Sequence, residues 1–348
     1  MSEPKNFRVI LGLMVVGPPG VPGARLTGLD NMTAALDIFQ ERGHREIDTA
    51  RLYLGGKQEA FTRAAGWKER GLAVATKAYP ITPGLHEPEV LAATLETSLS
   101  ELGTECVDIF YLHAPDRSVP FATTLEAVDK LHKAGKFKRL GLSNYTSFEV
   151  AEIAMTCATR GFVRPTVYQA LYNCLFRNIE DELIPACRRY GLAIDAYSPT
   201  GGGFLAGSIT SVDANPSEGR YAPGPMQHLT RGRYFRAGIV EGARIIRQAA
   251  EEAGVPPLEA AMRWLVHHSA LRGDSNRPEG ADGVVIGFSK LEQLMENLDA
   301  LEKGPLGPEL LDALERAWRA AKPDADHYWQ LPMVYGYDTQ EVLFGKTS

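Results

Sequence analysis

Four ionisable residues stand at or just beyond the ends of predicted buried strands. In HREIDTARLY, residues 44–53, Asp48 ends an apolar run and Tyr53 follows shortly after; Lys77 closes LAVATK and His113 closes VDIFYLH. A tyrosine hydroxyl, with an ordinary pKa of about 10, is too weak an acid to protonate a carbonyl oxygen efficiently near pH 7. Lys77, paired with Asp48, is expected to lower that pKa by about two to three units, and His113 to orient the substrate oxygen. The pattern needs no nucleophile and therefore predicts hydride transfer to a carbonyl group, with Tyr53 as the proton donor.

Each of these residues also has an ordinary structural explanation. Asp48 precedes a threonine and can cap a turn, and Lys77 can be a solvated strand end. His113 can be a core imidazole and Tyr53 an aromatic residue at the rim. The joint placement of an acid, a phenol, an ammonium group and an imidazole favours a catalytic set over four unrelated roles.

Short apolar segments that alternate with amphipathic helical patterns must position these side chains. Between the segments, apolar residues recur at helical spacing, as at Met32, Ala35, Leu36 and Phe39. The eight predicted strands are residues 8–14, 45–49, 72–77, 107–113, 137–143, 166–172, 192–198 and 283–288. An eightfold alternation predicts an α/β fold, the closed (β/α)8 TIM barrel with its active residues at the carboxyl ends of the strands. An open doubly wound sheet is the alternative.

The chain is predicted to form a single barrel domain over residues 1–348. Residues 208–234 are rich in Gly, Pro and polar residues without a sustained period, so they are predicted to form an irregular loop at the cofactor or substrate. Residues 323–348 are predicted to be a C-terminal tail that lies across the barrel or frays. Long loops are therefore expected at the carboxyl-terminal face of the barrel.

Hydride transfer needs a cofactor site, and two segments are candidates. GGGFLAG, residues 201–207, fits a loose GxGxxA pattern. No βα unit is predicted after it, so we reject a Rossmann dinucleotide site. We expect instead a flexible backbone segment that crosses over a ligand. Ser289 is predicted to cap a helix in a capping box with Glu292, where free N–H groups can hold phosphate. A purely structural cap is the alternative. His267 and His268 are adjacent and lack ligand spacing, so no metal site is predicted.

Composition and charge exclude several classes of partner. The formal net charge of −6 and the pI of about 5.8 argue against a surface for nucleic acid or anionic lipid. No apolar run reaches membrane-spanning length, and the N-terminus has no secretory signal. The four cysteines lack CxxC spacing and are predicted to be reduced thiols. These features predict a cytoplasmic protein with a small-molecule partner.

Longer motifs resemble the aldo-keto reductase superfamily. The resemblance covers about residue 8 to about residue 329, and the matching segments are EIDTARLY with GKQE, ATKAYP, LETSLSELGTECVDIFYLHAPD, LHKAGKFKRLGLSNYTSFEVAEI, PTVYQALYN, AYSP with GGGFLAG, and VIGFSKLEQLMENL. Within the superfamily the sequence is most similar to the aflatoxin-aldehyde reductases, which reduce aldehydes and dialdehydes with NADPH. The resemblance implies a (β/α)8 barrel and a catalytic tetrad of Asp48, Tyr53, Lys77 and His113.

The resemblance also implies a set of NADPH-binding residues. Ser143, Asn144 and Gln169 are expected to hold the nicotinamide carboxamide, and Tyr197 to stack on its ring. The segment from Ser198 to Leu205 is expected to pass over the pyrophosphate. The residues expected to bind the adenosine end, including a 2′-phosphate, are Arg220, Ser289, Gln293 and Asn297.

Several positions depart from relatives that accept acidic aldehydes. Those relatives carry a Tyr and an Arg in the long loop and a second Arg near the chain end; this chain has Thr230, keeps Arg233 as an expected substrate-binding residue, and has Gln330. Without the terminal guanidinium, bidentate capture of a carboxylate is weaker, which argues against an acidic semialdehyde as the preferred substrate. Ser208 stands where the family has a Lys after the glycine-rich turn, which removes one phosphate contact.

Two classes of function remain open at this point. The first is an NADPH-dependent reductase of aldehydes or ketones, a monomer or a homodimer. The alternative is a redox-sensing regulatory subunit that binds NADPH and a partner protein with little turnover, as the potassium-channel β subunits of the superfamily do.

Overall fold

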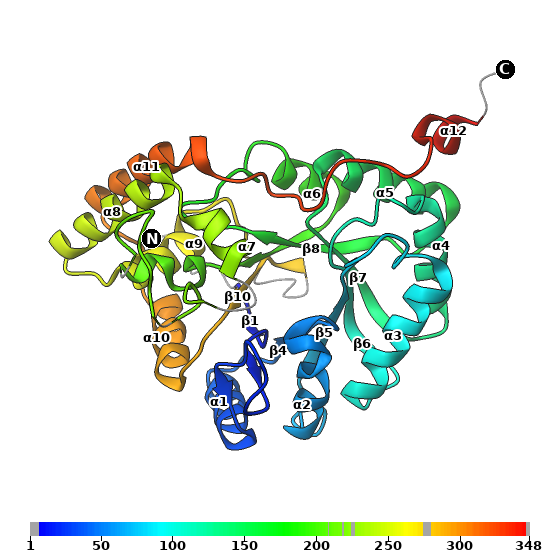
Figure 1. Ribbon diagram of the computed structural model, residues 1–348, viewed down its shortest axis with the longest axis horizontal. Coiled ribbons are helices and arrows are strands. Elements are labelled where there is room, and N and C mark those ends of the chain that lie inside the picture. Colours follow the sequence, from blue (N-terminus) through cyan, green and yellow to red (C-terminus); the bar gives the residue numbers. More distant parts are fainter. Residues whose placement is uncertain (1–6, 208, 218, 224–226, 274–279, 346–348) are drawn as a thin grey trace.

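Eight parallel strands close into a barrel in the computed structural model, which describes residues 7–207, 209–217, 219–223, 227–273 and 280–345 (Figure 1). Around the barrel the order is β1-β10-β9-β8-β7-β6-β5-β4, and β1 pairs with β4 to complete the ring. The strands are β1 (Arg8–Gly12), β4 (Glu46–Asp48), β5 (Ala73–Ala78), β6 (Val107–Leu112), β7 (Phe137–Ser143), β8 (Pro165–Leu171), β9 (Ala193–Tyr197) and β10 (Gly283–Ile286). An open sheet would leave two free edges, so the predicted (β/α)8 barrel is confirmed.

Most of the described helices lie around this barrel, and the last one, α12 (Thr339–Phe344), lies away from it at the end of the tail (Figure 1). The others are α1 (Leu29–Glu41), α2 (Gln58–Ala64), α3 (Pro88–Leu102), α4 (Phe121–Lys133), α5 (Ser147–Arg160), α6 (Leu183–Tyr190), α7 (Gln227–Tyr234), α8 (Ala237–Glu252), α9 (Pro257–His267), α10 (Leu291–Glu302) and α11 (Pro308–Ala321). Helices α8 and α11 pack side by side on the outer surface. The 3-10 segments are η1 (Tyr53–Gly56), η2 (Gly201–Ala206) and η4 (Lys322–Asp324), and β2 (Val16–Gly17) pairs with β3 (Leu26–Thr27) in a small separate sheet.

Helix α1 shows how the apolar pattern produces the outer layer. Its predicted stripe of Met32, Ala35, Leu36 and Phe39 is buried, with each side chain at most 1% exposed. Burial of such a stripe removes apolar surface from water at about 25 cal/mol per Å², so the helix is stabilised mainly by its contact with the sheet.

The interior of the barrel requires a close approach between two neighbouring strands. Gly141 of β7 lies beside Tyr111 of β6, and a Cβ at position 141 would come within 2.3 Å of the Tyr111 ring. Only glycine leaves room for this phenol, whose hydroxyl donates to Asp195 Oδ2 at 2.8 Å. A ring therefore fills the middle of the barrel.

The predicted irregular loop 208–234 is wrong for its last part, because residues 227–234 form helix α7. This helix lacks an apolar period, and aromatic contacts at its end hold it instead. The Tyr234 ring lies 5.0 to 5.6 Å, centroid to centroid, from the rings of Phe176, Phe204 and Tyr221. Long-range aromatic packing of this kind leaves no local sequence pattern.

The C-terminal tail runs past α6 and α5 before it ends in α12 (Figure 1). Tyr328 accepts a hydrogen bond from Ser147 N, at the start of α5, at 3.0 Å and donates to Glu182 beside α6. These contacts attach the described tail to the barrel. Among the helices that the structure describes, none has the length and apolar character needed to cross a membrane.

Candidate functional site

Lys77, Asp48 and Tyr53 form one hydrogen-bonded cluster at the carboxyl ends of β4 and β5. Lys77 Nζ lies 2.5 Å from Asp48 Oδ2, 2.7 Å from Thr49 O and 3.0 Å from Tyr53 Oη. Tyr53 Oη lies 3.4 Å from the same Asp48 oxygen. Lys77 is completely buried and Asp48 is 2% exposed, whereas Tyr53 is partly exposed. The cluster therefore presents a phenol, backed by a buried ion pair, to the mouth of the barrel.

The backbone between β4 and β5 explains why Tyr53 returns to Lys77. Beyond the end of β4, Thr49 N still donates to Ala75 O at 2.9 Å, and Arg51 N donates to Lys77 O at 3.1 Å. The chain then turns into η1, where Leu54 has a positive φ of 51°. This tight turn places the first residue of η1, Tyr53, over the end of β5.

The electrostatics of Tyr53 differ from the sequence-based prediction. Burial raises the pKa of the Tyr53 phenol well above its ordinary value, and the negative charge of Asp48 raises it further. Burial also lowers the pKa of Lys77, against the opposing effect of Asp48. The predicted lowering of the phenol pKa by Lys77 is therefore wrong, because desolvation of the phenolate and its repulsion by Asp48 outweigh the attraction of a cation that Asp48 already neutralises.

His113 completes the group and is a neutral imidazole. Burial, with a further contribution from the Lys77 cation, lowers its pKa well below the ordinary value. Its ring lies edge-on to Tyr53 at 6.1 Å and to Tyr79 at 5.3 Å between centroids. The buried Nδ1 atom has no hydrogen-bond partner among the described residues. An unsatisfied buried nitrogen beside a phenol is a feature expected of a ligand site.

The residues predicted to hold nicotinamide lie against this cluster. Gln169 Nε2 donates to Asp48 Oδ1 at 2.9 Å, and Ser143 Oγ donates to Gln169 O at 2.8 Å. Asn144 Nδ2 donates to His113 O at 2.8 Å, and Tyr197 Oη donates to Asn144 Oδ1 at 3.2 Å. The structure thus brings these side chains and the tetrad together at one end of the barrel.

The segment from Ser198 to Leu205 forms a turn with unusual backbone angles. Ser198 has a φ of 58°, and Gly202 and Gly203 have φ values of 64° and 89°. A Cβ on Gly203 would have nothing within 4 Å, so the backbone there is open to approach. Leu205 is 2% exposed, so its side chain belongs to the core. A ligand could therefore meet this segment mainly through its backbone.

One arginine crosses the same turn, and a second arginine lies near the first. A Cβ on Gly202 would come within 2.6 Å of Arg220 Cδ, so the Arg220 side chain crosses the glycine backbone. Arg25, a residue that the sequence reasoning missed, donates to Gly219 O. Burial lowers the pKa of Arg25, and the nearby Arg220 cation lowers it further. Two guanidinium groups near one glycine-rich turn form a cationic region suited to an anion.

The predicted capping box at Ser289 is wrong. Helix α10 begins at Leu291 with Lys290 as its N-cap and has no side-chain cap. Instead, the backbone N and the Oγ of Ser289 both donate to Gln293 Oε1 at 2.9 Å, because the glutamine side chain folds back over the helix start. Asn297 is 8% exposed and donates from Nδ2 to Gly287 O at 3.1 Å. Ser289, Gln293 and Asn297 do lie together just after β10.

The positions expected to contact substrate differ in burial and in hydrogen bonding. The Nε atom of Arg233 is buried without a partner among the described residues, and Thr230 is buried. Gln330 Oε1 accepts a hydrogen bond from Tyr79 Oη at 3.1 Å, so this tail residue reaches the mouth. Tyr79 was also missed, although its position two residues after Lys77 is a usable signal. Ser208 lies outside the described residues.

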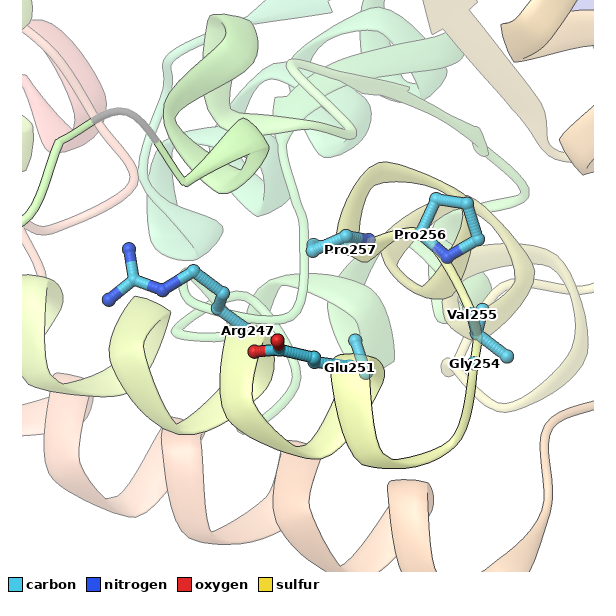
Figure 2. A pocket seen from close by; sticks show the side chains of 7 residues that line it. Arg247, Glu251, Gly254, Val255, Pro256 and Pro257 are labelled. Atoms are coloured by element: carbon cyan, nitrogen blue, oxygen red, sulfur yellow. The ribbon is translucent and has the colours of Figure 1, made fainter.

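Two surface hollows in the described part of the chain lie away from the tetrad. One lies where α8 turns into α9, lined by Arg247, Ala250, Glu251, Gly254, Val255, Pro256 and Pro257. Figure 2 shows Arg247 and Glu251 on α8 and the two prolines on the turn into α9. A second hollow lies between α2 and α3. Neither is lined by a tetrad residue, so the candidate site is defined by its converging polar side chains.

Comparison with known proteins shows similarity over most of the chain. The model of the aldo/keto reductase family matches residues 9–319. An aldo-keto reductase of Pseudocercospora fijiensis is 42% identical over 299 residues, which cover 84% of this chain and 99% of that protein. The human aldo-keto reductase family 7 member A3 is 39% identical and covers 92% of this chain and 96% of its own length. The human aflatoxin B1 aldehyde reductase member 2 is also 39% identical, with 95% and 92% covered.

The chain therefore belongs to the aldo/keto reductase family, and the resemblance found in its motifs is confirmed. It is an oxidoreductase that acts on carbonyl compounds.

Proposed function

We propose that the protein reduces an aldehyde or a ketone to an alcohol with NADPH, and that Tyr53 is the general acid. The observation that carries the proposal is the cluster of Lys77, Asp48 and Tyr53 with His113 beside it, at the end of the barrel where this fold places its chemistry. When bound, the reduced nicotinamide supplies the hydride.

The raised pKa of Tyr53 is compatible with this role. The phenol keeps its proton at neutral pH and can donate it to a substrate oxygen that becomes an alkoxide. An alkoxide is about as basic as hydroxide, the conjugate base of water with a pKa of about 15.7, so the transfer is favourable without a lowered phenol pKa. Lys77 Nζ, 3.0 Å from Oη, then stabilises the phenolate that remains.

Neutral His113 is proposed to orient the substrate oxygen. A neutral imidazole has one N–H donor, and its pKa, lowered by burial, keeps it from competing with Tyr53 as an acid. Asp48 holds Lys77 through Oδ2 and Gln169 through Oδ1, so one carboxylate fixes both the cation and an amide of the proposed nicotinamide site.

The residues present fit a dinucleotide phosphate. The open backbone at Gly203 and the guanidinium groups of Arg220 and Arg25 form a cationic region beside the tetrad. Ser143, Asn144, Gln169 and Tyr197 are proposed to bind the nicotinamide end, and Ser289, Gln293 and Asn297 the adenosine end. The preference for NADPH rests on the family resemblance.

Two observations bear on the substrate class and the compartment. One relative is named as a reductase of aflatoxin B1 aldehyde, which supports an aldehyde substrate. All four cysteines are free thiols, which fits the reducing cytoplasm that the sequence predicts.

The test is Tyr53→Phe, which removes the transferable proton and keeps the ring. We expect NADPH oxidation with an aldehyde to slow by about 10²- to 10⁴-fold, the usual contribution of a general acid, with the NADPH dissociation constant within about twofold of wild type. Full activity in this variant would contradict the role of Tyr53. Tight NADPH binding by the wild-type protein with negligible turnover of any carbonyl would instead favour the regulatory subunit.

A further inference from the structure

Arg117, in the loop between β6 and α4, binds the C-terminal tail at three consecutive residues. Its Nη1 donates to the carbonyl oxygens of Gln330 at 3.0 Å, Leu331 at 3.0 Å and Pro332 at 3.2 Å. In return, Gly336 N donates to Arg117 O at 2.8 Å. One side chain thus fixes a stretch of tail that is more than two hundred residues away in sequence.

Glu149 holds the guanidinium of Arg117 in place. Arg117 Nε and Nη2 donate to the two Glu149 oxygens at 2.7 and 3.0 Å, and the side chains are 3% and 0% exposed. Glu149 also accepts from Thr146 N at 2.8 Å, in the capping box of α5, and from Tyr335 Oη at 2.8 Å. A buried bidentate pair with further hydrogen bonds on the carboxylate has a single well-defined geometry. The tail is therefore attached to the barrel at a rigid point.

In the same stretch of tail, Gln330 binds Asn144 and Tyr79, which both contact His113. Gln330 N donates to Asn144 O at 3.0 Å, and Gln330 Oε1 accepts from Tyr79 Oη at 3.1 Å. The Tyr79 ring meets the His113 ring edge-on at 5.3 Å. Leu331 has a φ of 64°, a conformation that a leucine avoids unless its surroundings impose it. The Arg117 contacts on both sides of Leu331 impose this bend.

The amide nitrogen of Gln330 remains available as a hydrogen-bond donor. With Oε1 bound to Tyr79, the two N–H bonds of Nε2 make no hydrogen bond to a described residue. A neutral donor at this place suits a neutral acceptor oxygen on the substrate, away from the reacting carbonyl.

The geometry points to Arg117 as a positioning residue of the substrate site. By binding the backbone carbonyl oxygens of residues 330–332, Arg117 holds the Gln330 amide near Tyr79 and His113. In that position the amide favours substrates that carry a second oxygen away from the reacting carbonyl group. The inference rests on the proposed function. Nothing in it changes the proton or hydride steps, so its effect belongs in KM and not in kcat.

The test compares two aldehydes of nearly the same shape, para-formylbenzamide, which has a distal amide oxygen that is not reducible, and para-isopropylbenzaldehyde, which has none. Arg117→Lys keeps the charge but cannot bind Glu149 through two nitrogens and reach three carbonyls at once. We expect KM for the amide compound to rise about 5- to 10-fold, the value of one neutral hydrogen bond, with kcat and the KM of the isopropyl compound within about twofold.

Two further variants separate positioning from general damage. Gln330→Leu should reproduce the same selective rise, and the double variant should add nothing to it, because Arg117 acts through Gln330. Arg188→Lys is the matched control, since Arg188 makes a bidentate pair with Asp282 before β10 and does not touch the tail. This control should leave both KM values unchanged.

Hydrogen exchange gives a readout that does not depend on turnover. The N–H groups of Gln330 and Gly336 are hydrogen-bonded, and Arg117→Lys should make them exchange faster than in the Arg188→Lys control. Unchanged exchange, an equal KM change for both aldehydes or additive variants would overturn the positioning role. Failure of the wild-type protein to reduce either aldehyde would overturn the proposed function, and the selectivity with it, whereas faster exchange would still be measurable.

Discussion

The two ends of the barrel both contain buried charges, but they differ in how those charges are paired. At the amino-terminal end, Arg8 donates to Glu46 at 2.6 Å, to Asp195 and to Ala281 O at 3.0 Å. Asp282, before β10, accepts from Arg188 and from the backbone N of Ile194 at 2.8 Å. At the mouth, His113 Nδ1 and Arg233 Nε have no partner among the described residues. Arg188 Nε at the amino-terminal end also has no described partner, but the rest of that guanidinium binds Asp282, whereas the His113 ring makes no hydrogen bond to a described residue. The comparison teaches that neither burial nor one unpaired atom marks a site, and that a buried polar ring without any protein partner is the stronger sign.

Breaking the amino-terminal network should give the largest effect on stability. Arg8→Met leaves the Asp195 carboxylate, which is fully buried, without its cation, and we expect the free energy of unfolding to fall by about 3 to 5 kcal/mol. Because Arg8 is far from the mouth, kcat of the folded fraction should stay within about twofold. Urea unfolding and NADPH oxidation measure the two quantities. Arg42→Met, at a partly exposed pair with Asp299, is the control and should cost at most about 1 kcal/mol.

Acid should weaken the mouth end through its neutral imidazoles. Burial lowers the pKa of His86, near Asp116, to about 4, and that of His113 well below its ordinary value. The unfolded chain then binds more protons than the folded one below about pH 6.5, so stability that is fully present above that pH is lost as pH falls toward 4. Each histidine should contribute up to about 1.4 kcal/mol per pH unit.

Urea titrations between about pH 6.5 and 4.5 measure this slope. In His86→Gln, which has no titrating group, the slope should decrease by about one proton. An unchanged slope would show that His86 binds a proton as readily in the folded protein as in the unfolded chain, which contradicts its lowered pKa.

The smallest expected effect is a rate of carbonyl reduction that does not change with pH. This rate distinguishes a raised from a lowered pKa of the Tyr53 phenol. If the phenol pKa is raised, as in the structure, the rate of carbonyl reduction should be flat from neutral pH up to about pH 10. If Lys77 lowers it by about two to three units, as the sequence suggested, the rate should fall above about pH 7 to 8. The pH profile of kcat for one aldehyde decides between them.

Local sequence patterns were sufficient to predict most of the fold. Apolar runs and helical stripes such as Met32 to Phe39 predicted the eight strands and the barrel, because each element buries one face and the period records which one. Helix α7 escaped because its packing comes from Tyr234 contacts with distant rings, which leave no period in the segment itself.

The candidate site was predictable in its residue types and less so in its energetics. Strand ends in a barrel converge, so Asp48, Lys77 and His113 could be expected to meet. The direction of the shift in the Tyr53 pKa depends on the burial of the phenol and on how far Asp48 neutralises Lys77. Both depend on the folded arrangement of distant segments. Likewise, no spacing rule links Arg117 to residues 330–332, because the contact is made by folding alone.

Arg117 and Glu149 attach the tail to the barrel. The barrel holds the residues that carry out the reaction, and the tail can change which substrates are accepted. Residues 328–336 add no strand to the barrel, yet one of them, Gln330, reaches the mouth through its hydrogen bond with Tyr79. A library randomised only there, with Tyr335 and Gly336 kept, offers a route to new carbonyl preferences on an untouched scaffold.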